Sequence, residues 1–199
     1  MYNQPPVYVS ALLLASNSPR RRELLADAGF EFEVMPPKVV ERFDLNLTLR
    51  ELVSWNAVRK GIAAARTHAA KVVLAADTLV AIDQRILGKP RNRSEALTML
   101  RRLNGRAHEV CSAVFICHLA TGKSISFCEL SRVHFRRLSD SAIRSYIDKV
   151  NPVDKAGGYA AQESASEIIS KIDGSFTNVV GLPMERTKIE LAQFGIEPK

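Results

Sequence analysis

The chain has 199 residues, and 46% of them are hydrophobic, which is enough to build a core of ordinary size. Its formal net charge of +7 makes nucleic acid, a membrane surface and a small polyanion candidate partners. Export and membrane insertion are excluded, because the N-terminus lacks a signal-peptide pattern and no apolar run approaches about 18 residues, so we expect a cytoplasmic protein.

The first predicted elements are a short buried strand that ends at residue 16 and a helix over residues 19–28. Ser18 is the expected N-cap, followed by a proline at the first helical position. Arg20 and Arg21 then lie in the first turn. A positive side chain there costs about 0.3–1 kcal/mol, because a helix N-terminus is itself positive. A bound anion would remove this cost.

Two interpretations of this stretch stay open from the residues alone. Free N–H groups, serine hydroxyls and guanidinium groups together suit phosphate oxygens, which predicts a phosphate cradle. The alternative is a surface helix whose arginines pair with Glu23, Asp27 or solvent. Short basic motifs match by chance often, so the pattern alone favours neither.

The middle of the chain predicts a strand over residues 32–35, a long helix and further strands. Thr48 and Glu51 form a capping box, so the helix should begin there and run to about residue 68. We expect Trp55, on this helix, to pack against the core. Residues 71–82 read as one or two strands interrupted by the carboxylate of Asp77, followed by a hairpin at residues 83–84.

The second half predicts a helix over residues 94–103, β runs over residues 110–119 and 124–138, and a helix from Ser139 to about residue 150. We expect residues 166–180 to form a hairpin that turns at Asp173-Gly174, and a final helix to end before Gly195. Strands and helices therefore interleave, which is typical of an α/β protein. The cysteines lack ligand spacing and are expected to be buried thiols; they are Cys111, Cys117 and Cys128.

A second polar feature is Asp77-Thr78, set between apolar runs, with Lys89 following in a Gly-Lys-Pro stretch. A carboxylate in such a place is costly unless it is paired, hydrogen-bonded or bound to a metal. The alternative is an aspartate that caps a turn. Lys89 precedes a proline and is therefore held in an extended conformation, which would aim its side chain or simply leave it in a loop.

Five stretches, taken together in this order, resemble the Maf family of nucleoside triphosphate pyrophosphatases. They are LLLASNSPRRRELLADAGF, ADTLVAIDQRILGKP, SEALTMLRRLNGRAHEV, DKAGGYAAQ and IDGSFTNVVGLP, and they cover nearly all of residues 11–191. The resemblance implies a single Maf/ITPase-like α/β domain over residues 1–199, with a mixed sheet flanked by helices and two lobes around a central cleft. Residues 1–10 would be an extension outside the match. It also implies a homodimer that uses Mg²⁺ or Mn²⁺ to cleave a triphosphate into a monophosphate and pyrophosphate.

The resemblance also assigns the site residues. Asp77, Glu41 and Lys89 match the family's two acidic positions and the lysine of its Lys-Pro element. Our hypothesis is that all three are catalytic, with Glu41 and Asp77 as the metal ligands and Asp77 as the base that activates water. The substrate-binding positions that the resemblance implies are Ser16, Ser18, Arg20, Arg21, Lys60, Thr78 and Gln162. These roles agree with the chemistry, because a triphosphate carries about four negative charges and requires cations on its oxygens.

With Arg20 and Thr78 at these positions, the chain resembles the branch of the family that cleaves dTTP and UTP. A pyrophosphatase for 7-methyl-GTP or another modified nucleotide is the first alternative. The family branch that acts on 7-methyl-GTP tends to carry tryptophan at the position of Arg20, and this chain lacks that feature. Ala161 and Glu163 depart from the usual family pattern, which bears on the choice of base. A non-catalytic protein that binds nucleic acid or acts in cell division is the other alternative. Paired acids and few exposed-looking aromatic residues argue against a stable nucleic-acid complex.

Overall fold

The computed structural model describes residues 11–43, 46–162 and 164–199. The predicted extension over residues 1–10 and the departure at Glu163 lie outside these residues. Within them, one seven-stranded mixed sheet with the order β2-β1-β3-β5-β6-β7 runs through the molecule, and β4 pairs with β3. The strands are β1 (Leu12–Ala15), β2 (Phe32–Val34), β3 (Val72–Ile82), β4 (Arg85–Leu87), β5 (Ala107–His118), β6 (Lys123–Phe135) and β7 (Ile169–Asp173).

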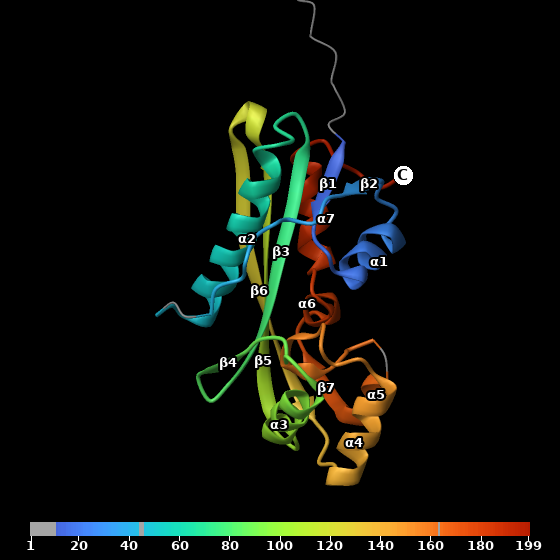
Figure 1. Ribbon diagram of the computed structural model, residues 1–199. Coiled ribbons are helices and arrows are strands. Elements are labelled where there is room, and N and C mark those ends of the chain that lie inside the picture. Colours follow the sequence, from blue (N-terminus) through green and yellow to red (C-terminus); the bar gives the residue numbers. More distant parts are fainter. Residues whose placement is uncertain (1–10, 44–45, 163) are drawn as a thin grey trace, which may run out of the picture.

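Long antiparallel strands give the molecule its elongated shape (Figure 1). β1 is parallel to β2 and β3, whereas β3, β5, β6 and β7 pair antiparallel in turn. The helices described are α1 (Pro19–Asp27), α2 (Leu49–Ala65), α3 (Arg93–Leu103), α4 (Asp140–Lys149), α5 (Ala165–Ile168), α6 (Phe176–Val180) and α7 (Met184–Ala192). The predicted α/β class with a mixed sheet flanked by helices is confirmed. Across these described residues, no helix is both long and apolar enough to cross a bilayer.

Helices cover the two faces of the sheet at one end and gather around it at the other (Figure 1). α2 packs on one face, where its buried residues join odd-numbered residues of β3 in one core cluster. α1 and α7 cover the opposite face, where Leu25 and Leu191 meet Leu74 of β3. α3 and α4 pack around the far ends of the same strands in a third cluster that contains Leu100 and Tyr146. The middle of β3 therefore lies between α2 and the α1 side.

Gly61 explains how closely α2 approaches the sheet. A Cβ atom at this position would lie 2.4 Å from Cδ1 of Phe115 on β5, which is far inside van der Waals contact. Helix propensity alone would favour alanine over glycine by about 1 kcal/mol, so the glycine is explained by packing and not by helix formation. The neighbouring Lys60 is thereby brought close to β3.

Several predicted boundaries are confirmed. Thr48 and Glu51 form the reciprocal capping box at the start of α2. Ser139 accepts a hydrogen bond from the Ala142 backbone N–H and caps α4. Asp83 and Gln84 both have positive φ, as a two-residue hairpin between β3 and β4 requires.

The prediction of a hairpin over residues 166–180 is wrong. Ile169–Asp173 forms β7 and pairs with β6, and the turn at Gly174 leads into α6 instead of a returning strand. The Ser175 hydroxyl accepts a hydrogen bond from the Asn178 N–H, so a cap starts a helix in a segment whose Val179 and Val180 favour strands.

Three further expectations need correction. Trp55 is 50% exposed and does not pack into the core, because it lies on the outward side of α2. β3 is one continuous strand, so Asp77 does not interrupt it. Cys111 and Cys117 are buried free thiols as predicted, whereas Cys128 is only half-buried and accepts a hydrogen bond from Arg50.

A buried histidine marks the core near the far ends of the strands. His108 is 2% exposed, its Nε2 lies 2.7 Å from the Tyr159 hydroxyl, and its ring packs edge-on against Phe135 and Tyr159. Its Nδ1 is buried and has no hydrogen-bond partner among the described residues. Burial lowers the pKa of His108 from 6.5 to about 3, so the ring is neutral at physiological pH.

This burial predicts a loss of stability in acid. As the pH falls below 6.5, the unfolded chain protonates His108 while the folded protein does not. The free energy of unfolding should therefore drop by about 1.4 kcal/mol per pH unit between the two pKa values, or about 2 kcal/mol from pH 7 to pH 5. Denaturant titrations of the wild type and His108→Gln at both pH values measure the difference. Equal pH slopes for the two proteins would contradict the prediction.

Candidate active site

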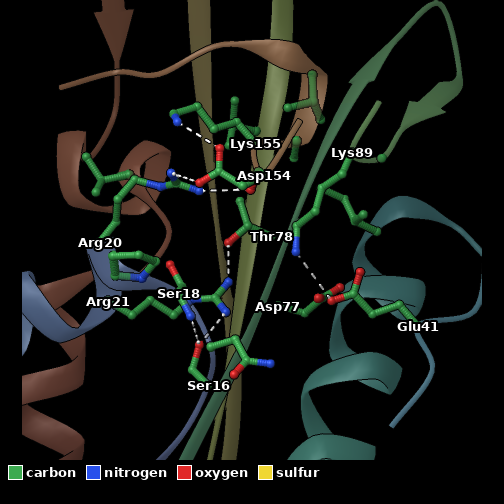
Figure 2. Close-up of a pocket in the computed structure, with 18 of the residues that line it drawn as sticks. Ser16, Ser18, Arg20, Arg21, Glu41, Asp77, Thr78, Lys89, Asp154 and Lys155 are labelled. Carbon is green, nitrogen blue, oxygen red and sulfur yellow. Dashed lines mark hydrogen bonds and ion pairs between the residues drawn. The ribbon is translucent and has the colours of Figure 1, made fainter. Parts of the chain in front are cut away.

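A cavity of about 250 Å³ opens beside the middle of β3 (Figure 2). Its walls come from the β1–α1 junction, the segment before α2, α2 itself, β3, the segment after β4 and the loop after α4. Its polar lining residues are Ser16, Asn17, Ser18, Arg20, Arg21, Glu41, Lys60, Asp77, Thr78, Lys89, Asp154 and Lys155. The structure therefore brings together all the residues predicted for the site except Gln162, which is exposed and is not among the described residues that line the cavity.

The β1–α1 junction is a tight turn built around one hydroxyl. The Ser16 Oγ accepts hydrogen bonds from the Ser18 backbone N–H at 3.1 Å and from Arg21 Nη1 at 3.3 Å. Ser18 is the N-cap of α1 as predicted, but its side chain makes no cap hydrogen bond. The first turn of α1 contains no acidic residue. The N–H groups of such a first turn have no acceptor within their own helix and suit an anion.

Arg21 is a buried member of this junction. Its Nε donates to the Gly181 carbonyl at 2.8 Å and its Nη2 donates to the Thr78 hydroxyl at 2.9 Å. Burial lowers the pKa of Arg21, whereas the charges of Asp77 and Glu41 raise it. A guanidinium stays protonated in proteins, so Arg21 places a fixed positive charge under the cavity.

Alternation along β3 places Asp77 and Thr78 on opposite faces of the sheet. Asp77 points to the α2 side, where Asn56 donates to its Oδ2 at 3.2 Å. Thr78 points to the α1 side, where its hydroxyl lies 2.8 Å from that of Ser112. One strand thus supplies an acid to one wall of the cavity and a hydroxyl to the other.

Lys60 joins the two acids on the α2 side. Its Nζ lies 2.6 Å from Oε1 of Glu41 and 2.6 Å from Oδ1 of Asp77. Lys89 lies further out, with its Nζ 4.0 Å from the same Glu41 oxygen (Figure 2). We define Glu41, Lys60 and Asp77 as the acid pair with its bridging lysine.

The two acids differ in their electrostatic surroundings. Burial raises the pKa of Asp77 above its usual range, and the Glu41 charge adds to this, although Lys60 acts in the opposite direction. Burial also opposes ionisation of Glu41, but Lys60 and Lys89 outweigh it and hold its pKa below the usual value. Asp77 is therefore the better proton acceptor, and Glu41 stays ionised.

The structure answers the question of what the first-turn arginines contact. Neither pairs with Glu23 or Asp27. Arg20 instead donates from Nη1 to the Asp154 carboxylate at 3.0 Å and from Nη2 to the Asp154 carbonyl at 3.1 Å. Sequence reasoning missed Asp154 because 134 positions separate it from its partner. Its presence in the matching stretch DKAGGYAAQ was the one available signal.

One end of the cavity is apolar. Tyr159, buried and turned with its hydroxyl toward His108, lies there with small and branched side chains. The other apolar residues at this end are Val80, Val110, Ala160, Ala161, Val179 and Val180. A cavity that is charged on one side and apolar on the other suits a ligand with an anionic tail and an uncharged ring.

Comparison with known proteins decides the family. A family model described as "Maf-like protein" matches residues 11–194. The chain belongs to the Maf-like protein family. A protein of Bdellovibrio bacteriovorus named dTTP/UTP pyrophosphatase is 43% identical over 92% of this chain and 98% of its own. Proteins of the same name from Desulforamulus reducens and Bacillus pumilus are 41% and 40% identical, over 94% and 96% of this chain and 97% and 100% of theirs.

Solved structures give a weaker likeness to this Maf-like protein. A HAM1 protein from Coxiella burnetii aligns with a TM-score of 0.45 at 18% identity, over 65% of this chain and 74% of that one. The Ham1 protein of Staphylococcus aureus aligns with a TM-score of 0.41 at 16% identity, over 63% and 72% of the two chains.

The acid pair could bind a divalent metal only if the phosphate oxygens of a bound substrate supplied further ligands. No group of three or more His, Cys, Asp or Glu side chains with metal-binding geometry occurs in the described part of this Maf-like chain. Mg²⁺ in nucleotide sites commonly takes one or two carboxylates and completes its shell with phosphate oxygens and water. Glu41 and Asp77 match that donor set, and one oxygen of each already accepts a hydrogen bond from the Lys60 ammonium. The two acids could thus hold a metal in company with phosphate oxygens.

Proposed function

We propose that this protein is a nucleoside triphosphate pyrophosphatase that hydrolyses dTTP and UTP to the monophosphate and pyrophosphate. The observation that carries the proposal is that one cavity is lined both by the start of α1, whose first turn holds two arginines and no acidic residue, and by Asp77, a buried acid with a raised pKa. The full-length similarity to relatives named dTTP/UTP pyrophosphatase supports the same reaction and the same substrates.

The proposed reaction uses both walls of the cavity. Arg20, Arg21 and the N–H groups at the start of α1 bind phosphate oxygens, and Lys89 offsets charge near the acid pair. A water oxygen forms a bond to a phosphorus of the α–β anhydride, and the P–O bond of that anhydride breaks to release pyrophosphate. The proton of the water passes to the carboxylate of Asp77. Mg²⁺ or Mn²⁺, held by Glu41 and Asp77 with the phosphates, would supply further charge neutralisation.

Three accompanying expectations rest on the family resemblance, and a fourth, the cytoplasmic location, rests on the sequence pattern alone. We propose a cytoplasmic homodimer, built from a single domain with two lobes around the cavity. We also propose that Gln162 approaches the base, although in this structure it lies outside the cavity lining. Sedimentation analysis of the pure protein tests the dimer, and a base-dependent change in KM for Gln162→Ala tests the contact.

The experiment for the function is pyrophosphate release from a panel of triphosphates with Mg²⁺. We expect turnover of dTTP and UTP, little turnover of 7-methyl-GTP, and none after removal of the metal with a chelator. Duplex DNA binding, measured across a salt series, is the contrasting assay. Salt-dependent DNA binding without hydrolysis of any triphosphate would contradict the proposal and favour a nucleic-acid-binding protein.

A further inference from the structure

A second three-residue charge cluster lies across the cavity from the acid pair (Figure 2). Arg20 at the start of α1 contacts Asp154 in the loop after α4, through both the side chain and the backbone carbonyl. The second carboxylate oxygen, Oδ1, accepts a hydrogen bond from Lys155 Nζ at 2.8 Å. Lys155 also donates to the Asn151 carbonyl at 2.8 Å, which ties it to its own loop. Asp154 therefore joins two cations with separate oxygens.

This cluster is the electrostatic opposite of the acid pair with its bridging lysine. There, one cation lies between two anions; here, one anion lies between two cations. The Arg20–Asp154–Lys155 cluster thus keeps one net positive charge. Burial alone would raise the pKa of Asp154, but the hydrogen bonds from Lys155 and Arg20 outweigh it and hold the pKa below its usual value. The carboxylate is charged at physiological pH.

The pairing leaves Arg20 able to bind a second anion. A guanidinium carries five N–H groups, and the contacts with Asp154 use one on each terminal nitrogen. The Nε–H and the remaining terminal N–H groups have no acceptor in the part of the chain that the structure describes. The side chain of Arg20 is 18% exposed and lines the cavity, so these donors belong to a guanidinium whose orientation is already set.

We propose that Asp154 is a positioning residue for the triphosphate, which holds the Arg20 guanidinium in the orientation that receives a phosphate group. The inference rests on the proposed function and adds to it a role for a residue outside the predicted site. Without Asp154, Arg20 would be a long side chain at a helix start with many rotamers, and binding would have to order it. Lys155 offsets the charge of Asp154, so its repulsion of the phosphates is reduced.

The test is Asp154→Asn, which keeps the side-chain shape but replaces one acceptor oxygen with an amide that faces a cation. We expect KM for dTTP to rise about three- to tenfold, the cost of ordering one long side chain, with kcat changed less than about twofold. The affinity for inorganic tripolyphosphate, measured by calorimetry, should fall by the same factor. Asp140→Asn is the matched control, because Asp140 pairs with Arg101 at an exposed site and lines no part of the cavity.

Repeating the substitution in an Arg20→Gln protein shows whether Asp154 acts by positioning Arg20 or whether the substitution merely damages the loop. In Arg20→Gln, the Asp154→Asn change should have no further effect on KM or on tripolyphosphate affinity, because the group that it positions is gone. The same loss in both backgrounds would overturn the inference, as would an unchanged or lower KM for Asp154→Asn alone. If the wild type hydrolyses no nucleotide, the proposed function is wrong, while the tripolyphosphate affinities still decide the role of Asp154.

Discussion

Asp77→Asn is expected to lower kcat by about a thousandfold, the largest effect on activity that the structure predicts. The amide keeps the shape of the side chain and an oxygen for the Lys60 ammonium, but it cannot take a proton from water. Burial and the nearby Glu41 charge raise the pKa of Asp77, which makes its carboxylate the stronger base of the two acids. Pyrophosphate release at saturating dTTP measures the effect.

The control for this substitution is Asp83→Asn. Asp83 is an exposed carboxylate that pairs with Arg106 and does not line the cavity, so its amide variant should keep wild-type turnover. Thermal unfolding of both variants checks that the fold is intact. Near-normal turnover in Asp77→Asn would show that proton transfer goes to another group, and the roles given to the acid pair would then be wrong.

Local signals predicted the parts of the site that depend on neighbouring residues. The N-cap position of Ser18 and the first-turn positions of Arg20 and Arg21 follow from the proline at residue 19. The capping box of Thr48 and Glu51 follows from hydrogen bonds within four residues. For this reason the β1–α1 turn and the residue at which α2 begins could be expected from the residues alone. The failure at residues 166–180 has the same origin, because branched residues favoured a strand locally while the cap at Ser175 started a helix.

Contacts between distant segments could not be predicted in this way. Nothing in the pattern around Lys60 indicates that its ammonium lies between Glu41 and Asp77, since this depends on Gly61 letting α2 approach the sheet. The pairing of Arg20 with Asp154 likewise depends on where the loop after α4 folds back. The family resemblance named most of these residues, but the bridges between them came only from the structure.

The bridging lysine leads to the largest expected effect on stability. Lys60→Met should lower the free energy of unfolding by about 3 kcal/mol at pH 7, because it leaves Asp77 charged and buried with a second carboxylate beside it. Asp77 is only 3% exposed, so water cannot replace the ammonium. Denaturant titration measures the loss. Lys71→Met, which removes a lysine from a partly exposed pair with Glu33, is the control and should cost less than about 1 kcal/mol.

The cause can be separated from lost packing by two further measurements. Without Lys60, the folded-state pKa of Asp77 should rise further above its unfolded value. The loss in the free energy of unfolding is therefore fully present at pH values above the folded pKa. It shrinks as the pH falls, because the folded protein then takes up a proton that the unfolded chain lacks, and it vanishes below the unfolded pKa of about 3.9. The double variant Lys60→Met/Asp77→Asn should recover most of the lost stability at pH 7, since no buried charge is left at position 77. A double variant as unstable as Lys60→Met alone would mean that the lysine stabilises the fold through its packing and not through the two acids.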